Sequence, residues 1–118
     1  MAYEIPGFVY SEKADAAAIT QYHAVQLKED GLVTCPAGEK CDGIVQQPVA
    51  ASTKETVRVM KSGISFAIAG AGGVTRGAEV VVGAAAGVFE DHDNNGDIVV
   101  GKALESVSAG EVFSVLLY

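Results

Sequence analysis

The sequence predicts an all-β protein, folded as a compact barrel or sandwich of many short strands. Val, Ile and Thr cluster in short runs that Gly, Pro, Asp and Asn interrupt. Apolar and polar residues alternate in "TVRVMK" and "VFSVLL", with the period of two that a half-buried strand requires. Turn-forming dipeptides recur along the chain, among them Asp30-Gly31 and Asp42-Gly43. Short strands with regular turns are typical of sandwiches and barrels.

The N-terminal half contains the one segment that is not strand-like. Residues 11–23, "SEKADAAAITQYH", are rich in Ala, and we expect a short helix or an irregular arm there. Four β-type runs overlap or follow it, separated by turn signals. They predict strands at residues 23–28, 32–35, 43–47 and 55–61.

The C-terminal half carries five further β-type runs, which begin after Ser62-Gly63. A glycine-rich stretch follows the first of them, and Asn95-Gly96 and Ala109-Gly110 mark later turns. The runs predict strands at residues 64–69, 78–83, 87–90, 97–104 and 111–118.

The two halves look like copies of one pattern, offset by about 55 residues. The aligned pairs are Ile19 with Val74, Val25 with Val80, Leu27 with Val82, Gly31 with Gly87, Val33 with Phe89, and Val57 with Phe113. We therefore expect an N-terminal arm over residues 1–11 and a single β-domain over residues 12–118. Within that domain, the pseudo-repeats would span about 12–62 and 63–118.

Length and charge narrow the functional classes. A chain of 118 residues is sufficient for one domain. Its formal net charge of −7 repels phosphate backbones, and no Lys/Arg cluster offsets this, so we expect no nucleic-acid partner. No apolar run approaches the roughly 20 residues that span a bilayer, and no signal peptide is visible. We expect no membrane association, and assembly in a cytoplasm.

The stretch "DHDNNGDIVVG" at residues 91–101 begins like a calcium-binding EF-hand loop. Its twelfth position is Lys102, where a bidentate Glu should stand, and neither flank is helical. Asn95-Gly96 between "GVF" and "IVV" instead predicts a tight hairpin. A weak surface cation site within residues 91–97 is the remaining alternative, and we expect no metal centre.

The two cysteines, Cys35 and Cys41, flank "PAGEK". Zinc requires four ligands at recognisable spacing, and His23 and His92 are far away in sequence. Because no secretion signal is present, two free thiols are favoured over a disulfide.

Other motifs do not assemble a catalytic or cofactor site. A dinucleotide-binding motif, G-x-G-x-x-G, in the glycine stretch at residues 70–77 would need its third glycine where Thr75 stands. No helix pattern follows the stretch either. We expect His23 and His92 on the surface, and the carboxylates form no evident acid–base pair. The sequence therefore predicts no catalytic residue, no cofactor and no enzymatic activity.

The N-terminal segment is unusually rich in large apolar groups. Tyr3, Ile5, Pro6, Phe8 and Tyr10 all precede the first regular strand pattern. A free tail is normally poorer in such groups. The segment is therefore either an edge strand packed on its own core, or an arm that docks on a neighbouring subunit or another protein.

The chain resembles the capsid decoration, or cement, proteins of tailed bacteriophages over nearly its whole length. The telling pieces are "AAAITQYHAVQL", "DGIVQQPVAA", "VTRGAEV" and "VGKALESVSAGEVFSVLL", in that order and spacing. The resemblance implies a small, β-rich, non-enzymatic virion protein. Such proteins bind the outside of an expanded icosahedral head and clamp neighbouring major capsid subunits.

That role also predicts how the protein associates. A chain of this size offers a limited interface by itself, so we expect a homo-oligomer, with a trimer favoured and a dimer as the alternative. The competing functional class is a β-sandwich ligand- or carbohydrate-binding module. Such modules usually present aromatic residues on a concave face, whereas this chain lacks Trp and carries its aromatics toward its two ends.

Overall fold

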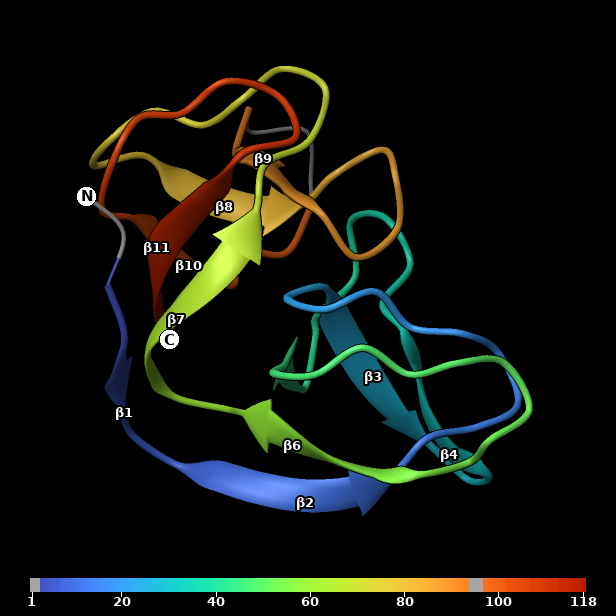
Figure 1. The fold of residues 1–118 in the computed structure, drawn as a ribbon. Helices are drawn as coiled ribbons and strands as arrows, with labels where there is room; N and C mark the ends of the chain where they lie inside the picture. Colours follow the sequence, from blue (N-terminus) through green and yellow to red (C-terminus); the bar gives the residue numbers. More distant parts are fainter. Residues whose placement is uncertain (1–2, 94–96) are drawn as a thin grey trace.

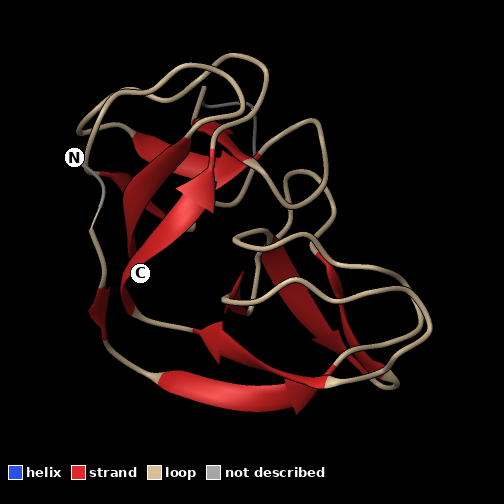
Figure 2. Cartoon of the chain, in the orientation of Figure 1, coloured by secondary structure: helices blue, strands red, loops and turns tan. Residues whose placement is uncertain are grey.

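The computed structural model describes residues 3–93 and 97–118, and over these residues the chain is all-β. Eleven strands form two antiparallel sheets, and no helix occurs in this part of the chain (Figures 1 and 2). The all-β prediction is confirmed. It follows that no helix in the described residues is long and apolar enough to cross a membrane.

Residues 9–60 form the first sheet, which we call the N-terminal lobe. Its strand order is β2-β6-β5-β3-β4. The strands are β2 (Val9–Lys13), β3 (Ala24–Lys28), β4 (Gly31–Thr34), β5 (Gly43–Val45) and β6 (Thr56–Met60).

Residues 63–117 form most of the second sheet, the C-terminal lobe. Its order is β1-β7-β11-β10-β8-β9. The strands are β1 (Ile5–Pro6), β7 (Gly63–Ile68), β8 (Glu79–Val82), β9 (Phe89–Asp91), β10 (Gly101–Ala103) and β11 (Val112–Leu117). Figure 1 shows the two lobes side by side, joined by the β1–β2 and β6–β7 connections.

The two lobes have the same strand order once β1 is set aside, and their cross-strand registers correspond. Met60 pairs with Val9 and Ile44 in one lobe, as Leu116 pairs with Ile64 and Lys102 in the other. We call two residues equivalent when they hold the same position in the two ladders. Leu27 pairs with Leu32 as Val82 pairs with Phe89, so Phe89 is equivalent to Leu32. The sequence alignments of Val33 with Phe89 and of Gly31 with Gly87 were therefore both wrong by one residue.

Each sheet curls toward a small barrel. In the N-terminal lobe, the residue after β2 meets β4 in an isolated parallel bridge between Ala14 and Leu32. In the C-terminal lobe, the equivalent bridge joins Ala69 and Phe89. The right-handed twist of short antiparallel strands favours this closure, because it brings the outer strands of a five-stranded sheet toward each other.

Two clusters of buried apolar side chains make up the core. One fills the N-terminal barrel and consists of Ala14, Ile19, Val25, Leu32, Val45, Val49, Val57 and Val59. The other fills the C-terminal barrel and continues across the seam between the lobes, where Ala24, Cys35, Cys41, Ile44 and Met60 join it. The seam is therefore part of the hydrophobic core, and the lobes are packed together by apolar burial.

Several local predictions need correction. Residues 11–23 form no helix, because they include the end of β2 and a bridge from Ile19 to Val49. The strand predicted at 97–104 is shorter, covering Gly101–Ala103. The predicted hairpin is also wrong, because β9 and β10 lie on opposite sides of β8 and do not pair with each other. The Asn95-Gly96 turn itself lies outside the described residues.

The N-terminal segment takes part in both sheets. β1 pairs with β7 at one edge of the C-terminal lobe, and β2 pairs with β6 in the N-terminal lobe. β2 runs across residue 11, where the sequence suggested that the arm ends. The segment is thus held by backbone hydrogen bonds within its own chain. The division of the chain into an arm, a domain and two repeated units stays a prediction.

Candidate interaction surfaces

Three hydrogen bonds outside the strand ladders hold the N-terminal segment in place. The Ser114 hydroxyl donates to the carbonyl oxygen of Tyr3 at 2.6 Å. The Glu4 carboxylate accepts the amide of Phe66 at 3.3 Å, beyond the end of β1. The amide of Phe8 donates to the Ser62 hydroxyl at 2.8 Å, where the chain crosses from one lobe to the other.

The side chains of the same segment remain largely in solvent. Tyr3, Ile5 and Phe8 are 47%, 57% and 59% exposed, and Pro6 is also exposed. Tyr10 alone is half-buried, with its ring stacked near that of Phe8 at a centroid distance of 6.0 Å. Of the five residues predicted to form an interface, four therefore present apolar surface that the chain itself does not cover.

An open groove of about 630 Å³, which we call the mouth groove, lies beside β2 and β3 of the N-terminal barrel. It is lined by Phe8, Tyr10, Ser11, Glu12, Leu27, Asp42 and Lys61. A second hollow of about 350 Å³ continues from it along β2 toward the β3–β4 turn, and the two share Glu12 and Leu27. The groove has apolar walls and a charged rim.

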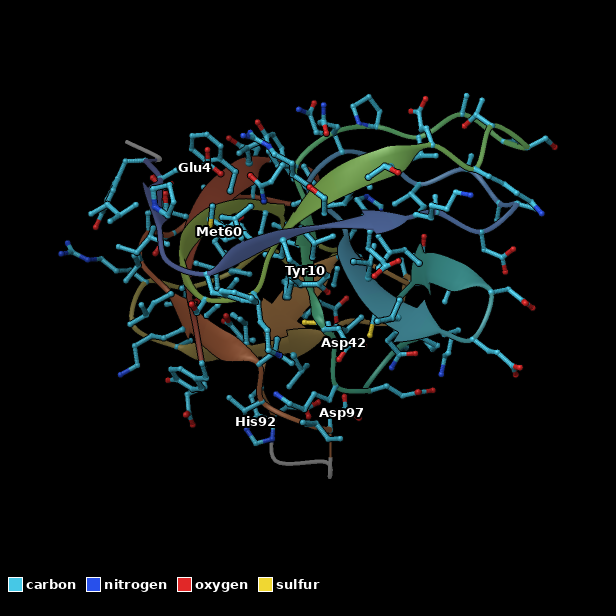
Figure 3. All side chains as sticks on the ribbon, turned by 90° about the horizontal axis from the view of Figure 1, so that it is seen from below. Glu4, Tyr10, Asp42, Met60, His92 and Asp97 are labelled. Atoms are coloured by element: carbon cyan, nitrogen blue, oxygen red, sulfur yellow. The ribbon has the colours of Figure 1, made fainter. Side chains whose placement is uncertain are left out.

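Tyr10 and Asp42 both line the mouth groove, and they lie near each other in Figure 3. The Tyr10 hydroxyl donates to the carbonyl oxygen of Asp42 at 3.3 Å, and the Asp42 carboxylate accepts the amide of Leu27 at 2.8 Å. Burial, followed by the charges of Asp42 and Glu12, raises the pKa of the Tyr10 phenol above its usual value. The Tyr10 hydroxyl therefore keeps its proton and stays a hydrogen-bond donor.

At the equivalent place in the C-terminal barrel, which we call the closed mouth, the described residues leave no open groove. Residues at ladder positions equivalent to much of the groove lining are buried, and they are Ser65, Ala67, Val82, Val100 and Leu117. Four residues that pair side by side across β2, β6, β5 and β3 pack in the same cluster. We call them the seam row, and they are Val9, Met60, Ile44 and Ala24. The Gln46 side chain adds a hydrogen bond to Ser65 at 3.1 Å.

The loop between the two cysteines strengthens this closure. The amide of Gly38 donates to Val82 at 2.8 Å and its carbonyl oxygen accepts from Ile98 at 3.1 Å. Cys35 and Cys41 are consequently buried at the seam, and the structure leaves both as free thiols. Burial raises the pKa of the Cys35 thiol to about 12, so it is not a reactive nucleophile at neutral pH.

The row equivalent to the seam row lies on the outside of the C-terminal lobe, and we call it the outer row. It consists of Ile64, Leu116, Lys102 and Glu79, with Ile5 of β1 extending it beyond Ile64. Leu116 is 38% exposed, and Lys102 and Glu79 are also exposed. This is a second surface with apolar and charged side chains in solvent.

The histidines are less exposed than the sequence suggested. His23 is half-buried at the seam, where a Cβ on Gly87 would approach its Nδ1 to 2.6 Å. Burial lowers its pKa below the usual value. His92 is half-buried as well, and its amide donates to Glu79 at 2.8 Å. Neither histidine lies on an open strand face.

The acidic and glycine-rich stretches have structural partners. The Asp91 carboxylate accepts the amide of Thr75 at 3.0 Å, which ties the glycine-rich loop to β9. Within residues 3–93 and 97–118, no three His, Cys, Asp or Glu side chains gather as a metal site. Asn94 to Gly96, central to the cation hypothesis, lie outside the described residues.

Comparisons with known proteins reveal no match in sequence but do reveal matches among solved structures. No protein-family model and no curated protein matches the sequence. Among solved structures, the fold matches the N base of head fiber gp8.5 in bacteriophage phi29, with a TM-score of 0.81. The chain is similar in fold to the base of a phage head fiber. The match covers 94% of this chain and 95% of that chain at 15% sequence identity, so the likeness establishes the fold.

Sequence reasoning missed Leu27 and Leu116, which mark the two open surfaces. Both lie in runs that the pattern predicts as strands, and nothing in either run distinguishes them from ordinary strand residues. Pattern alone places Leu27 on the same face as the buried Val25, as the structure shows. Leu27 is exposed because it lines the open mouth groove, and the groove is a tertiary feature that no local signal reports.

Proposed function

We propose that this protein is a structural component of a bacteriophage head. It binds the outside of the shell as a decoration or cement protein and stabilises contacts between major capsid subunits. The observation that carries the proposal is the fold match to a phage head-fiber base over nearly the full length of both chains. The decoration role itself follows the expectation drawn from the sequence, and no family model or curated protein matches the chain.

The exposed side chains suit a protein that adheres to a large surface. Tyr3, Ile5, Pro6 and Phe8 present apolar surface from a backbone that is already ordered, so binding costs little conformational entropy. A fully buried large side chain contributes roughly 1.5–3 kcal/mol, so a few such contacts suffice for specific docking. In an oligomer on a symmetric shell, several weak contacts act together. Such a role requires neither catalysis nor a cofactor.

Heads of the virus that encodes the chain provide the test, prepared with and without the protein. We expect extra density on the outside of the shell in the particles that contain it, by electron cryomicroscopy. Purified protein should also co-sediment with the heads that lack it. Equal particles in the two preparations, together with no co-sedimentation, would contradict the proposal.

A carbohydrate-binding module is the second candidate, and one observation favours it. Phe8 and Tyr10 stack in the mouth groove beside Glu12, Asp42 and Lys61, a combination that suits a sugar ring with its hydroxyls. A glycan array probed with the purified protein separates the two roles. Binding that disappears in Phe8→Ala, with no affinity for heads, would favour the carbohydrate module.

A further inference from the structure

The seam inside the chain is a contact between two unlike surfaces. The seam row of the N-terminal lobe supplies Met60, Ile44 and Ala24, and the closed mouth of the C-terminal lobe supplies Ala67, Val82 and Leu117. All six residues are buried in one continuous cluster. One lobe thus packs the outside of its sheet onto the barrel end of the other.

Both surfaces occur a second time, because the lobes have equivalent ladders. The outer row repeats the seam row on the C-terminal lobe, and the mouth groove repeats the closed mouth on the N-terminal lobe. The mouth groove has Tyr10, Glu12 and Leu27 where the closed mouth has Ser65, Ala67 and Val82. Within one chain, these second copies face solvent at separate places and cannot meet.

The two open surfaces differ from the closed pair in a matched way. Where the seam row has Ile44 and Ala24, the outer row has Lys102 and Glu79. Where the closed mouth has Ala67, Val100 and Leu117, the mouth groove has Glu12, Asp42 and Lys61; these replacements hold the same ladder positions. Each surface keeps an apolar part and gains charges of both signs, so the two complement each other.

We propose that the outer row of one chain docks in the mouth groove of a second copy, in the manner of the seam between the lobes. Ile64 and Leu116 cover Leu27 and the exposed side of Tyr10. The Lys102 ammonium meets the Glu12 or Asp42 carboxylate, and Glu79 meets Lys61.

This contact is heterologous, because the outer row of one chain meets a different surface, the mouth groove, on the next chain. Repetition of such a contact builds a closed ring, or an open filament if the rotation does not close. A ring of three is consistent with the oligomer that the sequence suggests. The proposal goes beyond the capsid role and does not depend on it, because self-association is measured on the purified chain alone.

Two lysine substitutions separate the surfaces. Leu116→Lys disrupts the outer row and Leu27→Lys disrupts the mouth groove, each at an exposed side chain. Val112→Lys is the matched control, since Val112 lies on the same strand and the same face as Leu116 but outside the row. Each disruptive substitution should weaken self-association by about tenfold or more, because it removes roughly one buried apolar side chain. Sedimentation equilibrium over a concentration series measures this.

A mixing experiment then identifies the heterologous contact. A chain with Leu116→Lys keeps its mouth groove, and a chain with Leu27→Lys keeps its outer row. Each alone should be monomeric, whereas an equimolar mixture should form a heterodimer through the one intact pair of surfaces. If either lysine variant unfolds, Leu116→Ser and Leu27→Ser provide the same pair of measurements.

Three results would overturn the proposal. The first is a wild-type chain that stays monomeric at the highest soluble concentration, even if its groove binds a sugar or a capsid subunit. The second is an equal loss of association in Val112→Lys. The third is an oligomer that Leu116→Lys disrupts and Leu27→Lys leaves intact, because that pattern means a symmetric contact between two outer rows.

Discussion

Met60 and Leu116 occupy equivalent positions in the two lobes, yet Met60 is 3% exposed and Leu116 is 38% exposed. Met60 is the last residue of β6, which pairs with β2. Leu116 lies one residue before the end of β11, which pairs with β7. Met60 is covered because the C-terminal lobe packs against it, whereas Leu116 stays partly open to solvent over the part of the chain that the structure describes. The same position in one ladder thus stabilises the fold and in the other forms an outer surface.

This difference predicts opposite effects of one substitution. Met60→Lys places an ammonium in the seam, and we expect it to lower the free energy of unfolding by about 3–5 kcal/mol, the range for an uncompensated buried charge. Leu116→Lys should change it by no more than about 0.5 kcal/mol, as for other surface changes. Urea unfolding of the two variants at a concentration where the chain is monomeric measures both. Similar losses in the two would mean that Leu116 is also part of the core.

The second prediction concerns the exposed N-terminal side chains. A chain with both Tyr3→Ala and Phe8→Ala should keep its melting temperature within about 2 °C, because both side chains are about half exposed. Its affinity for phage heads should fall more than tenfold, which requires a loss of only about 1.4 kcal/mol.

Ile98→Ala is the control for this pair, as it removes an exposed apolar side chain away from the N-terminal segment. Thermal melts and head co-sedimentation are measured on all the proteins. Full binding by a stably folded Tyr3→Ala, Phe8→Ala chain would exclude these residues from the capsid contact. A large loss of stability would instead show that the segment serves mainly its own core.

The third prediction separates backbone strain from close approach. Gly63 and Gly77 both have positive φ, at 97° and 83°. A Cβ on Gly77 would meet nothing within 4 Å, whereas one on Gly63 would lie 2.5 Å from the carbonyl oxygen of Ile5. Gly77→Ala should therefore cost about 1–2 kcal/mol from the left-handed conformation alone. Gly63→Ala should cost more, because β1 must also move away from β7.

Hydrogen exchange at the Gly7 amide reports this movement directly. That amide donates to the Ser62 carbonyl oxygen at 3.2 Å, at the junction that β1 holds in place. We expect its protection to fall in Gly63→Ala and to persist in Gly77→Ala. Unchanged protection in Gly63→Ala would mean that β1 tolerates the added methyl group.

The fourth prediction follows from the Cys35 thiol, whose pKa rises from 9.0 to about 12 because of burial. Below pH 9 the thiol is protonated in both states and contributes no pH dependence. Between pH 9.0 and about 12 the unfolded thiol ionises while the folded one does not, so unfolding releases a proton. The free energy of unfolding should then fall as pH rises, by up to about 1.4 kcal/mol per pH unit from this group.

Urea unfolding at a series of alkaline pH values measures the slope, and Cys35→Ala is the control. Burial also raises the pKa of Cys41 and Tyr10, so the control keeps part of the slope. The slope in Cys35→Ala should nonetheless be clearly smaller. An identical slope in both proteins would show that Cys35 ionises as readily in the folded chain as in the unfolded one.

Strand pairing is where prediction from sequence reached its limit. The Asn95-Gly96 signal predicts a hairpin between its flanking runs, but β8 lies between β9 and β10 in the sheet. A turn signal reports that the chain can reverse, and it says nothing about which strand then offers free hydrogen-bonding groups. The Ala-rich segment at residues 11–23 is a similar case, because its bridge from Ile19 to Val49 is a long-range contact that outweighs helix propensity.

What the sequence by itself determined is local or periodic: the β character, most turn positions, and the apolar richness of the N-terminal segment. Alternation and turn chemistry act over a few residues, so they can be recognised without a fold. Only the tertiary structure decided which of two equivalent surfaces is buried. The seam row and the outer row hold the same positions in equivalent ladders, and the difference between them comes from the packing of one lobe on the other.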